Sequence, residues 1–354
     1  MEAFISETGG ALGSVSFKLK HRWIAPYYQP DWLPDECSDN LPPLYRQFRG
    51  SFLGFPFARK RTRGLPFGET ANADWAVSRY DICRIGLKQN PVEASGGEVE
   101  RLFHLVNDHR ALYLEQRFSG FGGRRSVGVM SLLQLPANET VLLSVSPFTF
   151  GQVSPHLHCP EESVYSQMKP GARFKNLTQV PAIDGSSIDF SRLPLLRGYD
   201  EQVLLHQHSG ELLWIAVSMP GYIWLSLRVP DDLPGLFLWH ANSGMHGAPW
   251  NGELRDMLAV GEVCSYYDQP LRVSRQNPLE ADGVPTVLNF SRRKATVLRT
   301  IQAVHPVERD FGAVTSIEPV LGEPAVEIRN AKGVSYRVPL HWQFLKQGES
   351  VLTR

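Results

Sequence analysis

The sequence lacks an excess of either charge, and it lacks any long uncharged apolar run. Its 354 residues include 36 Lys and Arg against 36 Asp and Glu, which gives a formal net charge of zero. A nucleic-acid or anionic-membrane binder would show a basic excess, so we expect neither partner. No window of about 18 residues is apolar and free of charge, so no bilayer-spanning segment is expected. The first residues lack a basic stretch followed by an apolar run, so no secretory signal is expected either.

Cysteine is also scarce. The chain has four cysteines, and no two of them form a Cys-x-x-Cys pair: Cys37, Cys83, Cys159 and Cys264. This spacing argues against a disulfide framework and against a Cys-rich zinc site. We therefore expect buried thiols in a reducing compartment, which indicates a cytoplasmic protein.

Helical periodicity is rare, and strand patterns dominate. The two best helix candidates are Gly97–His109, which also alternates like a strand, and Arg293–Val304. Alternating or short apolar runs bounded by Gly, Pro, Asn and Asp predict strands. Hairpin turns are expected at Met219-Pro220-Gly221 and at Asn330–Gly333. The predicted strands lie at 111–118, 126–135, 140–150, 202–208, 211–218, 222–229, 235–241, 313–321 and 325–340.

No internal repeat, low-complexity tract or long linker divides the chain. Many strands at short spacing predict an all-β fold, a large sandwich of antiparallel sheets. The start of the chain is Pro-rich, so we expect residues 1–45 to form an irregular arm packed on a single domain of residues 46–354. A basic run follows, typical either of a solvated face or of a phosphate-recognising rim. Its members are Arg46, Arg49, Arg59, Lys60, Arg61 and Arg63.

The segment Leu65–Arg79, "LPFGETANADWAVSR", places polar side chains beside an aromatic ring. Asn72 and Asp74 stand directly before Trp75, and Glu69 and Thr70 precede them. A sugar site needs donors and acceptors for hydroxyls, together with an aromatic plate for the apolar face of the ring. The alternative is an ordinary turn entering a strand, in which Asn and Asp bond the local backbone.

The segment "SPHLHCPEE" holds His156 and His158, followed by Glu161 and Glu162. Two His at i and i+2 on a strand point to the same face, so they could share a metal or a substrate. The pattern is similar to the first metal motif of the cupins, but no convincing second cupin segment follows. A second pair, His206 and His208, shows how easily the pattern arises, so we expect no metal site.

The stretch Leu238–Tyr267 crowds His, Trp, Asn and acidic residues around a glycine-rich turn. A strand ends at Asn242-Ser243-Gly244, and Pro249 keeps the following segment out of a helix. A second apolar strand then carries one acid, Glu262. A carboxylate inside an apolar strand is costly unless it is paired or used, and burial would raise its pKa toward that of a general base. The alternative is a strand end that faces water.

The motifs "GETANADW", "LWHANSGMHGAPWNG" and "MLAVGEVCSYY", in this order over approximately Leu44 to Tyr267, resemble the aldose 1-epimerase (galactose mutarotase-like) superfamily. The resemblance implies a β-supersandwich with a shallow sugar site across one sheet. It also implies that a Glu takes the proton from the anomeric hydroxyl while a His protonates the ring oxygen. Only protons move, so no cofactor is expected.

Carried onto this chain, the resemblance makes Glu262 the general base and His156 or His158 the acid. The chain departs from the family pattern at Phe67 and Phe148, which stand where relatives carry His. These departures leave the fold intact and favour an alternative, a sugar-binding protein without catalysis. The implied substrate contacts are Asn72, Asp74, Trp75, Asn242, His246 and Trp250.

The expected partner is a small sugar or sugar phosphate. The leading hypothesis is an isomerase that interconverts sugar anomers, and the second is a non-catalytic carbohydrate-binding protein on the same fold. A third is a cupin-like metalloenzyme built on His156, His158 and Glu162. Nothing in the sequence indicates the oligomeric state.

Overall fold

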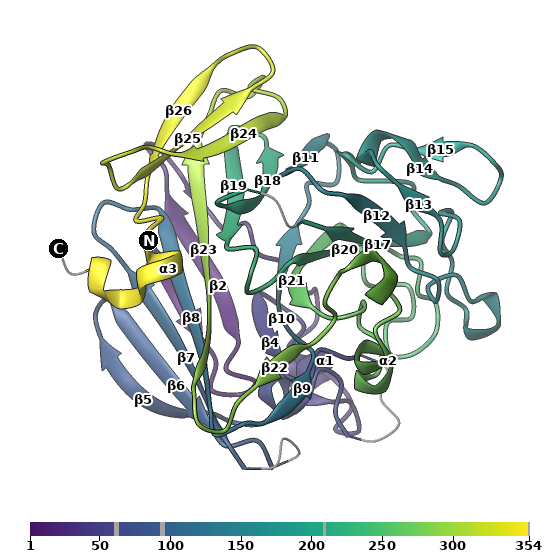
Figure 1. The fold of residues 1–354 in the computed structure, drawn as a ribbon. Coiled ribbons are helices and arrows are strands. Elements are labelled where there is room, and N and C mark those ends of the chain that lie inside the picture. Colours follow the sequence, from purple (N-terminus) through teal and green to yellow (C-terminus); the bar gives the residue numbers. More distant parts are fainter. Residues whose placement is uncertain (60–63, 93–95, 208–209, 353–354) are drawn as a thin grey trace.

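The protein is a sandwich of two large antiparallel sheets (Figure 1). The computed structural model describes residues 1–59, 64–92, 96–207 and 210–352. Within these ranges nearly all regular structure is β-strand, and the helices are short. The expectation of an all-β fold is therefore confirmed.

The first sheet has ten strands and supports the candidate site. Its strand order interleaves the start of the chain with its middle, so strands far apart in sequence become neighbours. In sheet order these are β1 (Glu2–Ile5), β2 (Leu12–Lys18), β4 (Ser51–Gly54), β10 (Val127–Gln134), β21 (Met257–Cys264), β20 (Gly235–Asn242), β17 (Tyr199–His206), β12 (Phe150–Val153) and β13 (Arg173–Phe174), with β3 (Trp23–Ile24) beside β2.

The second sheet has nine strands, and three small sheets complete the fold. The nine are β16 (Arg192–Leu193), β11 (Val141–Val145), β18 (Leu213–Met219), β19 (Tyr222–Arg228), β23 (Thr296–Pro306), β8 (Ala111–Ser119), β7 (Glu98–Leu105), β6 (Arg84–Gln89) and β5 (Ala76–Asp81). The small sheets are β14 (Val180–Pro181) with β15 (Ser187–Ile188), β9 (Gly123–Arg125) with β22 (Leu288–Phe290), and β24 (Val314–Pro319), β25 (Ala325–Asn330) and β26 (Ser335–Pro339).

Both helix candidates are strands. The segment 97–109 forms β7, as its alternation allowed, and the segment 293–304 forms most of β23. Both strands pair with β8 along its length, and this tertiary pairing outweighs local helix propensity. Only short helices occur, α1 (Pro43–Arg46), α2 (Leu271–Gln276) and α3 (Phe344–Gln347), and none found in the described residues is long and apolar enough to cross a membrane.

The central strands of the first sheet are covered on both faces. Every residue of β20 and β21 is buried. Leu238 and Val260 face the second sheet, whereas Phe237 and Ala259 face a second apolar cluster on the other side. Covering both faces explains why these strands read as continuous apolar runs.

The N-terminal arm is more regular than expected. Residues 2–24 contain β1, β2 and β3, which join the first sheet, so only the following stretch up to β4 is largely irregular. That stretch packs Tyr28, Leu44 and Phe48 against the outer apolar cluster of the first sheet. The arm therefore covers the sheet face that carries the candidate site.

The C-terminal three-stranded sheet lies at the top of Figure 1, on the outer face of the second sheet. Its β25–β26 hairpin turns at Asn330–Gly333 as predicted, and β18 and β19 meet at Met219 and Tyr222 in the other predicted hairpin. Among the cysteines, Cys264 is buried, whereas Cys37, Cys83 and Cys159 are half-buried.

Candidate functional site

A cavity of about 260 Å³ lies beside the outer face of the first sheet. Three stretches of chain distant in sequence form its walls: the arm and the segment after β4, the loop after β12, and the loop after β20. Both ionisable and aromatic side chains line the cavity: a guanidinium, an imidazole and a carboxylate lie beside aromatic rings. The lining residues used below are Tyr45, Arg59, His156, Glu162, Met245 and Trp250.

Arg59 is the fixed cation of the cavity. Its Nε lies 2.6 Å from Oδ2 of Asp268, and its Nη1 lies 3.5 Å from the sulfur of Met245. The guanidinium also lies over the ring of Trp239, 5.5 Å from the ring centre. Burial lowers the pKa of Arg59, but Asp268 and then Tyr45 and Asp200 raise that pKa by more, so Arg59 stays charged.

Asp200, on β17, interacts with the residues that surround Arg59. Its carboxylate accepts hydrogen bonds from Trp239 Nε1 at 2.8 Å and from the backbone N–H groups of Asn242 and Gly244 at 3.0 and 2.7 Å. Gly244 permits this approach because a Cβ there would lie 2.1 Å from the backbone N of Asp200. Burial raises the pKa of Asp200 to about 6, against the lowering effect of these donors.

Aromatic rings form the opposite wall. The ring of Trp250 lies 4.9 Å from those of both Tyr45 and Phe48, and 6.3 Å from that of Trp32. Only 6% of Trp250 is exposed, which leaves one part of its indole toward the cavity. The wall is therefore closely packed and suited to contact the apolar face of a small ring.

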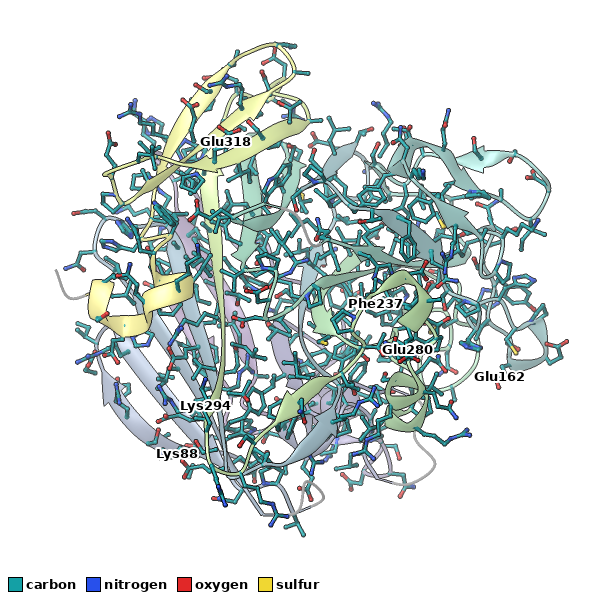
Figure 2. The ribbon with its side chains drawn as sticks, in the orientation of Figure 1. Lys88, Glu162, Phe237, Glu280, Lys294 and Glu318 are labelled. Carbon is teal, nitrogen blue, oxygen red and sulfur yellow. The ribbon has the colours of Figure 1, made fainter. Side chains whose placement is uncertain are left out.

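His156 and Glu162 line the cavity from the loop after β12. Figure 2 shows Glu162 on this outer loop. Both side chains are exposed, so they are accessible to a ligand. An imidazole and a carboxylate are side chains of the kind that transfer protons to and from a ligand.

The two histidines of "SPHLHCPEE" do not share a site. They lie in a loop rather than on a strand, so the i, i+2 rule that placed them on one face does not apply. His158 turns away and accepts a hydrogen bond from the backbone N–H of Ser166 at 3.2 Å. Across the described residues no group of three or more metal-ligating side chains occurs. His206 faces the ring of Phe150, and His208 lies outside the described residues.

Glu262 lies between the two sheets rather than in the cavity. Its side chain is buried and accepts a hydrogen bond from Ser226 Oγ at 2.9 Å, with Arg228 Nη1 at 3.5 Å. Burial raises its pKa as expected, against the lowering effect of Arg228. Because both partners come from β19 of the second sheet, this position does not support a role as base toward a ligand in the cavity.

The segment Leu65–Arg79 also lies away from the cavity. Asn72 is buried and bonds backbone groups of Pro66, Gly68 and Leu44, as the turn hypothesis predicted. Trp75 is 2% exposed and donates its indole N–H to the carbonyl of Thr70. Asp74 accepts a hydrogen bond from Thr8 and lines a separate groove beside the arm.

Asn242 and His246 flank the cavity without lining it. The Asn242 amide donates to the carbonyl of Leu195 at 2.9 Å, so its side chain has a structural partner. His246 is exposed and its ring lies 5.1 Å from that of Tyr165. Of the predicted site residues, the structure brings together His156 and Trp250.

Sequence reasoning missed the roles of Asp200, Asp268 and Tyr45, and it placed Arg59 only within a basic run. Asp200 carries no local signal, because it stands before the predicted strand 202–208, as many acids do, although it is the second residue of β17. Phe67 is buried among aromatic rings, and Phe148 packs on Phe174. In the basic run, Arg46 pairs with Asp39, and Lys60, Arg61 and Arg63 lie outside the described residues.

No protein-family model and no curated protein sequence matches this chain. Solved structures are nevertheless similar over most of its length. A candidate aldose 1-epimerase from Escherichia coli K12 matches with 13% identity and a TM-score of 0.56, covering 86% of this chain and 96% of its own. A galactose mutarotase-like protein from Lactobacillus casei (15%, 0.54) covers the same shares, and a galactose mutarotase related enzyme from Lactobacillus acidophilus (13%, 0.56) covers 86% and 95%. The chain therefore has the galactose mutarotase-like fold.

Proposed function

We propose that the protein binds an aldose or aldose phosphate in the cavity and interconverts its anomers. The observation that carries the proposal is the lining of the cavity, which brings exposed His156 and Glu162 together with Arg59 and Trp250. The similar structures named for aldose 1-epimerase and galactose mutarotase support a sugar as the ligand class.

The size and polarity of the cavity support a single sugar ring. Its volume of about 260 Å³ lies just below the range of about 300 to 1,000 Å³ that is usual for small-molecule sites. Trp250 offers an apolar plate for one face of the ring, and Arg59 offers N–H donors for hydroxyl or phosphate oxygens. An extended oligosaccharide would need a longer groove.

In this proposal His156 and Glu162 carry the proton transfers in place of Glu262. One group removes the proton of the anomeric hydroxyl, while the other protonates the ring oxygen, so the ring opens and can close in either configuration. A histidine and a carboxylate suit these roles because both can exchange protons near neutral pH when a neighbour adjusts their pKa. Arg59, held in place by buried Asp268, would orient the sugar.

A second candidate function is sugar binding without catalysis. The burial of Glu262 between the sheets favours it, because the carboxylate that the family resemblance made the base does not reach the cavity. Both candidates place the ligand on the same wall, so binding and turnover must be measured separately.

The test is two-dimensional NMR exchange between the α and β anomers of a panel of aldoses and aldose 6-phosphates. The proposal predicts faster exchange with the wild-type protein, loss of about 10²-fold or more in both His156→Ala and Glu162→Gln, and no change in Glu262→Gln if that variant folds. Saturable binding by calorimetry, lost in Trp250→Ala but without exchange, would establish the binding protein instead. Neither exchange nor binding across the panel would overturn both candidates.

A further inference from the structure

A cluster of arginines surrounds the short sheet of β9 and β22, near the bottom of Figure 1. The two strands pair antiparallel, with Leu288 opposite Arg125 and Phe290 opposite Gly123. Helix α2 packs on β9, and the turn after β22 begins at Ser291. Three separate elements therefore bring cationic side chains to one short segment, residues 122–125.

Each arginine of this cluster is held by a different contact. Arg275, from α2, donates its Nε–H to the carbonyl of Arg124 at 2.8 Å. The side chain of Arg292 lies across Gly122, where a Cβ would meet its Cγ at 3.2 Å and its Nε at 3.4 Å. The guanidinium of half-buried Arg125 lies over the ring of Phe55, 5.8 Å from the ring centre.

The charges are close enough to repel one another. Burial lowers the pKa of Arg125, and the positive charges of Arg275 and Arg292 lower it further. Among the ion pairs of the described residues, none joins Arg275 or Arg292 to a carboxylate. Arg124, Arg293 and Lys294 add exposed positive charge around them, and Figure 2 shows Lys294 at the turn after β22.

We propose that Arg125, Arg275 and Arg292 bind a phosphate monoester on a small molecule. Arg275 and Arg292 carry exposed charge beside Arg124 and Gly122, and the N–H groups of a guanidinium can donate in pairs to the oxygens of a phosphoryl group. The cations of this cluster gather around one short segment, residues 122–125, which suits a single phosphoryl group rather than the long charge array of a nucleic acid. This site is distinct from the sugar cavity and does not depend on the function proposed for it.

The test is a titration of the full chain with inorganic phosphate at constant ionic strength, set with chloride. Phosphate binding is expected to raise the Tm in a saturable way and to shift the NMR signals of the arginine Nε–H groups. The double variant Arg275→Ala/Arg292→Ala should weaken binding at least tenfold. The matched control Arg309→Ala, an exposed arginine in another part of the chain, should bind phosphate like the wild type.

Two arms separate the sources of phosphate. Glucose 6-phosphate and phenyl phosphate should bind at least as tightly as inorganic phosphate, and phenyl phosphate should still bind to folded Trp250→Ala, because Trp250 lines the sugar cavity and not the arginine cluster. A short single-stranded DNA that binds more than a hundredfold more tightly than phosphate would overturn the proposal in favour of a nucleic acid. Equal phosphate binding by the wild type and the double variant, or none by either, would also overturn it.

Discussion

Asp200 and Glu262 are both buried carboxylates of the first sheet, on the two strands that flank β20, and they face opposite sides. Asp200 faces the apolar cluster on the outer side of the first sheet. It accepts hydrogen bonds from three neutral N–H donors, one of them that of Gly244, and the charge of Arg59 lowers its pKa. Glu262 faces the second sheet and is held by Ser226 and Arg228. Burial raises the pKa of both.

The comparison shows that burial raises the pKa of a carboxylate on either face of the sheet, so a raised pKa does not indicate which face carries a site. A carboxylate can act on a ligand only where it contacts the ligand itself or interacts with a residue that does. The charge of Asp200 raises the pKa of Arg59, which lines the cavity, whereas Glu262 is bonded to Ser226 and Arg228 between the two sheets. A buried carboxylate with a raised pKa is therefore a candidate for a functional role only if it can also reach the ligand.

The largest expected effect comes from a substitution that breaks the buried ion pair of Arg228 and Glu262. Arg228→Met should lower the free energy of unfolding by about 3 to 5 kcal/mol, because it leaves Glu262 buried without its cation and removes the donor to Gln207. Urea denaturation measures this loss. The double variant Arg228→Met/Glu262→Met should recover much of it, since no charge is then stranded. A single variant within about 1 kcal/mol of the wild type would show that the pair is not structural.

The second effect concerns the pH dependence of Asp200. Its pKa rises from 3.8 to about 6 on folding, so between these pH values the folded protein holds a proton that the unfolded chain has released. Stability relative to Asp200→Asn should therefore fall by about 2 to 3 kcal/mol as the pH rises from 4 to 6, and stay level above 7. Urea denaturation of both proteins at each pH cancels the contribution of buried histidines. A difference that rises with pH would refute the assignment.

A third and smaller effect tests the close approach beneath the cavity. Gly244→Ala should cost about 2 kcal/mol, because its Cβ would lie 2.1 Å from the backbone of Asp200, where no flexible side chain can yield. Gly13→Ala is the matched control, since its Cβ would lie 3.3 Å from the nearest atom. Thermal unfolding of the two variants should differ accordingly, and equal Tm values would contradict the packing argument.

The smallest effect concerns the segment that sequence reasoning favoured. Asp74→Asn should change stability by less than about 0.5 kcal/mol, because its hydrogen bond to Thr8 is exposed. It should also leave sugar binding by calorimetry unchanged, because Asp74 lies in a groove apart from the cavity. Loss of sugar binding in this variant would return the site to Leu65–Arg79.

The fold was predictable because alternation and short apolar runs are local signals. The sandwich and both hairpins followed from them, and the family resemblance agreed with the structural comparison. The faces of the buried strands were not predictable, because β21 is apolar on both sides and Glu262 could point either way. The cavity was only partly predictable. Trp250 and His156 stood in notable motifs, but Asp268, Asp200 and Tyr45 meet Arg59 only through tertiary packing.

The walls of the cavity come from residues 45–59, 156–164 and 245–250, which are far apart along the chain. Contacts of such long sequence separation are usually among the slower ones to form during folding. A ligand that needs all three walls binds the completed native state and stabilises it by mass action. A sugar in the cavity would therefore bind only molecules that have finished folding. It would protect against proteolysis only those molecules whose first 60 residues had already packed on the first sheet.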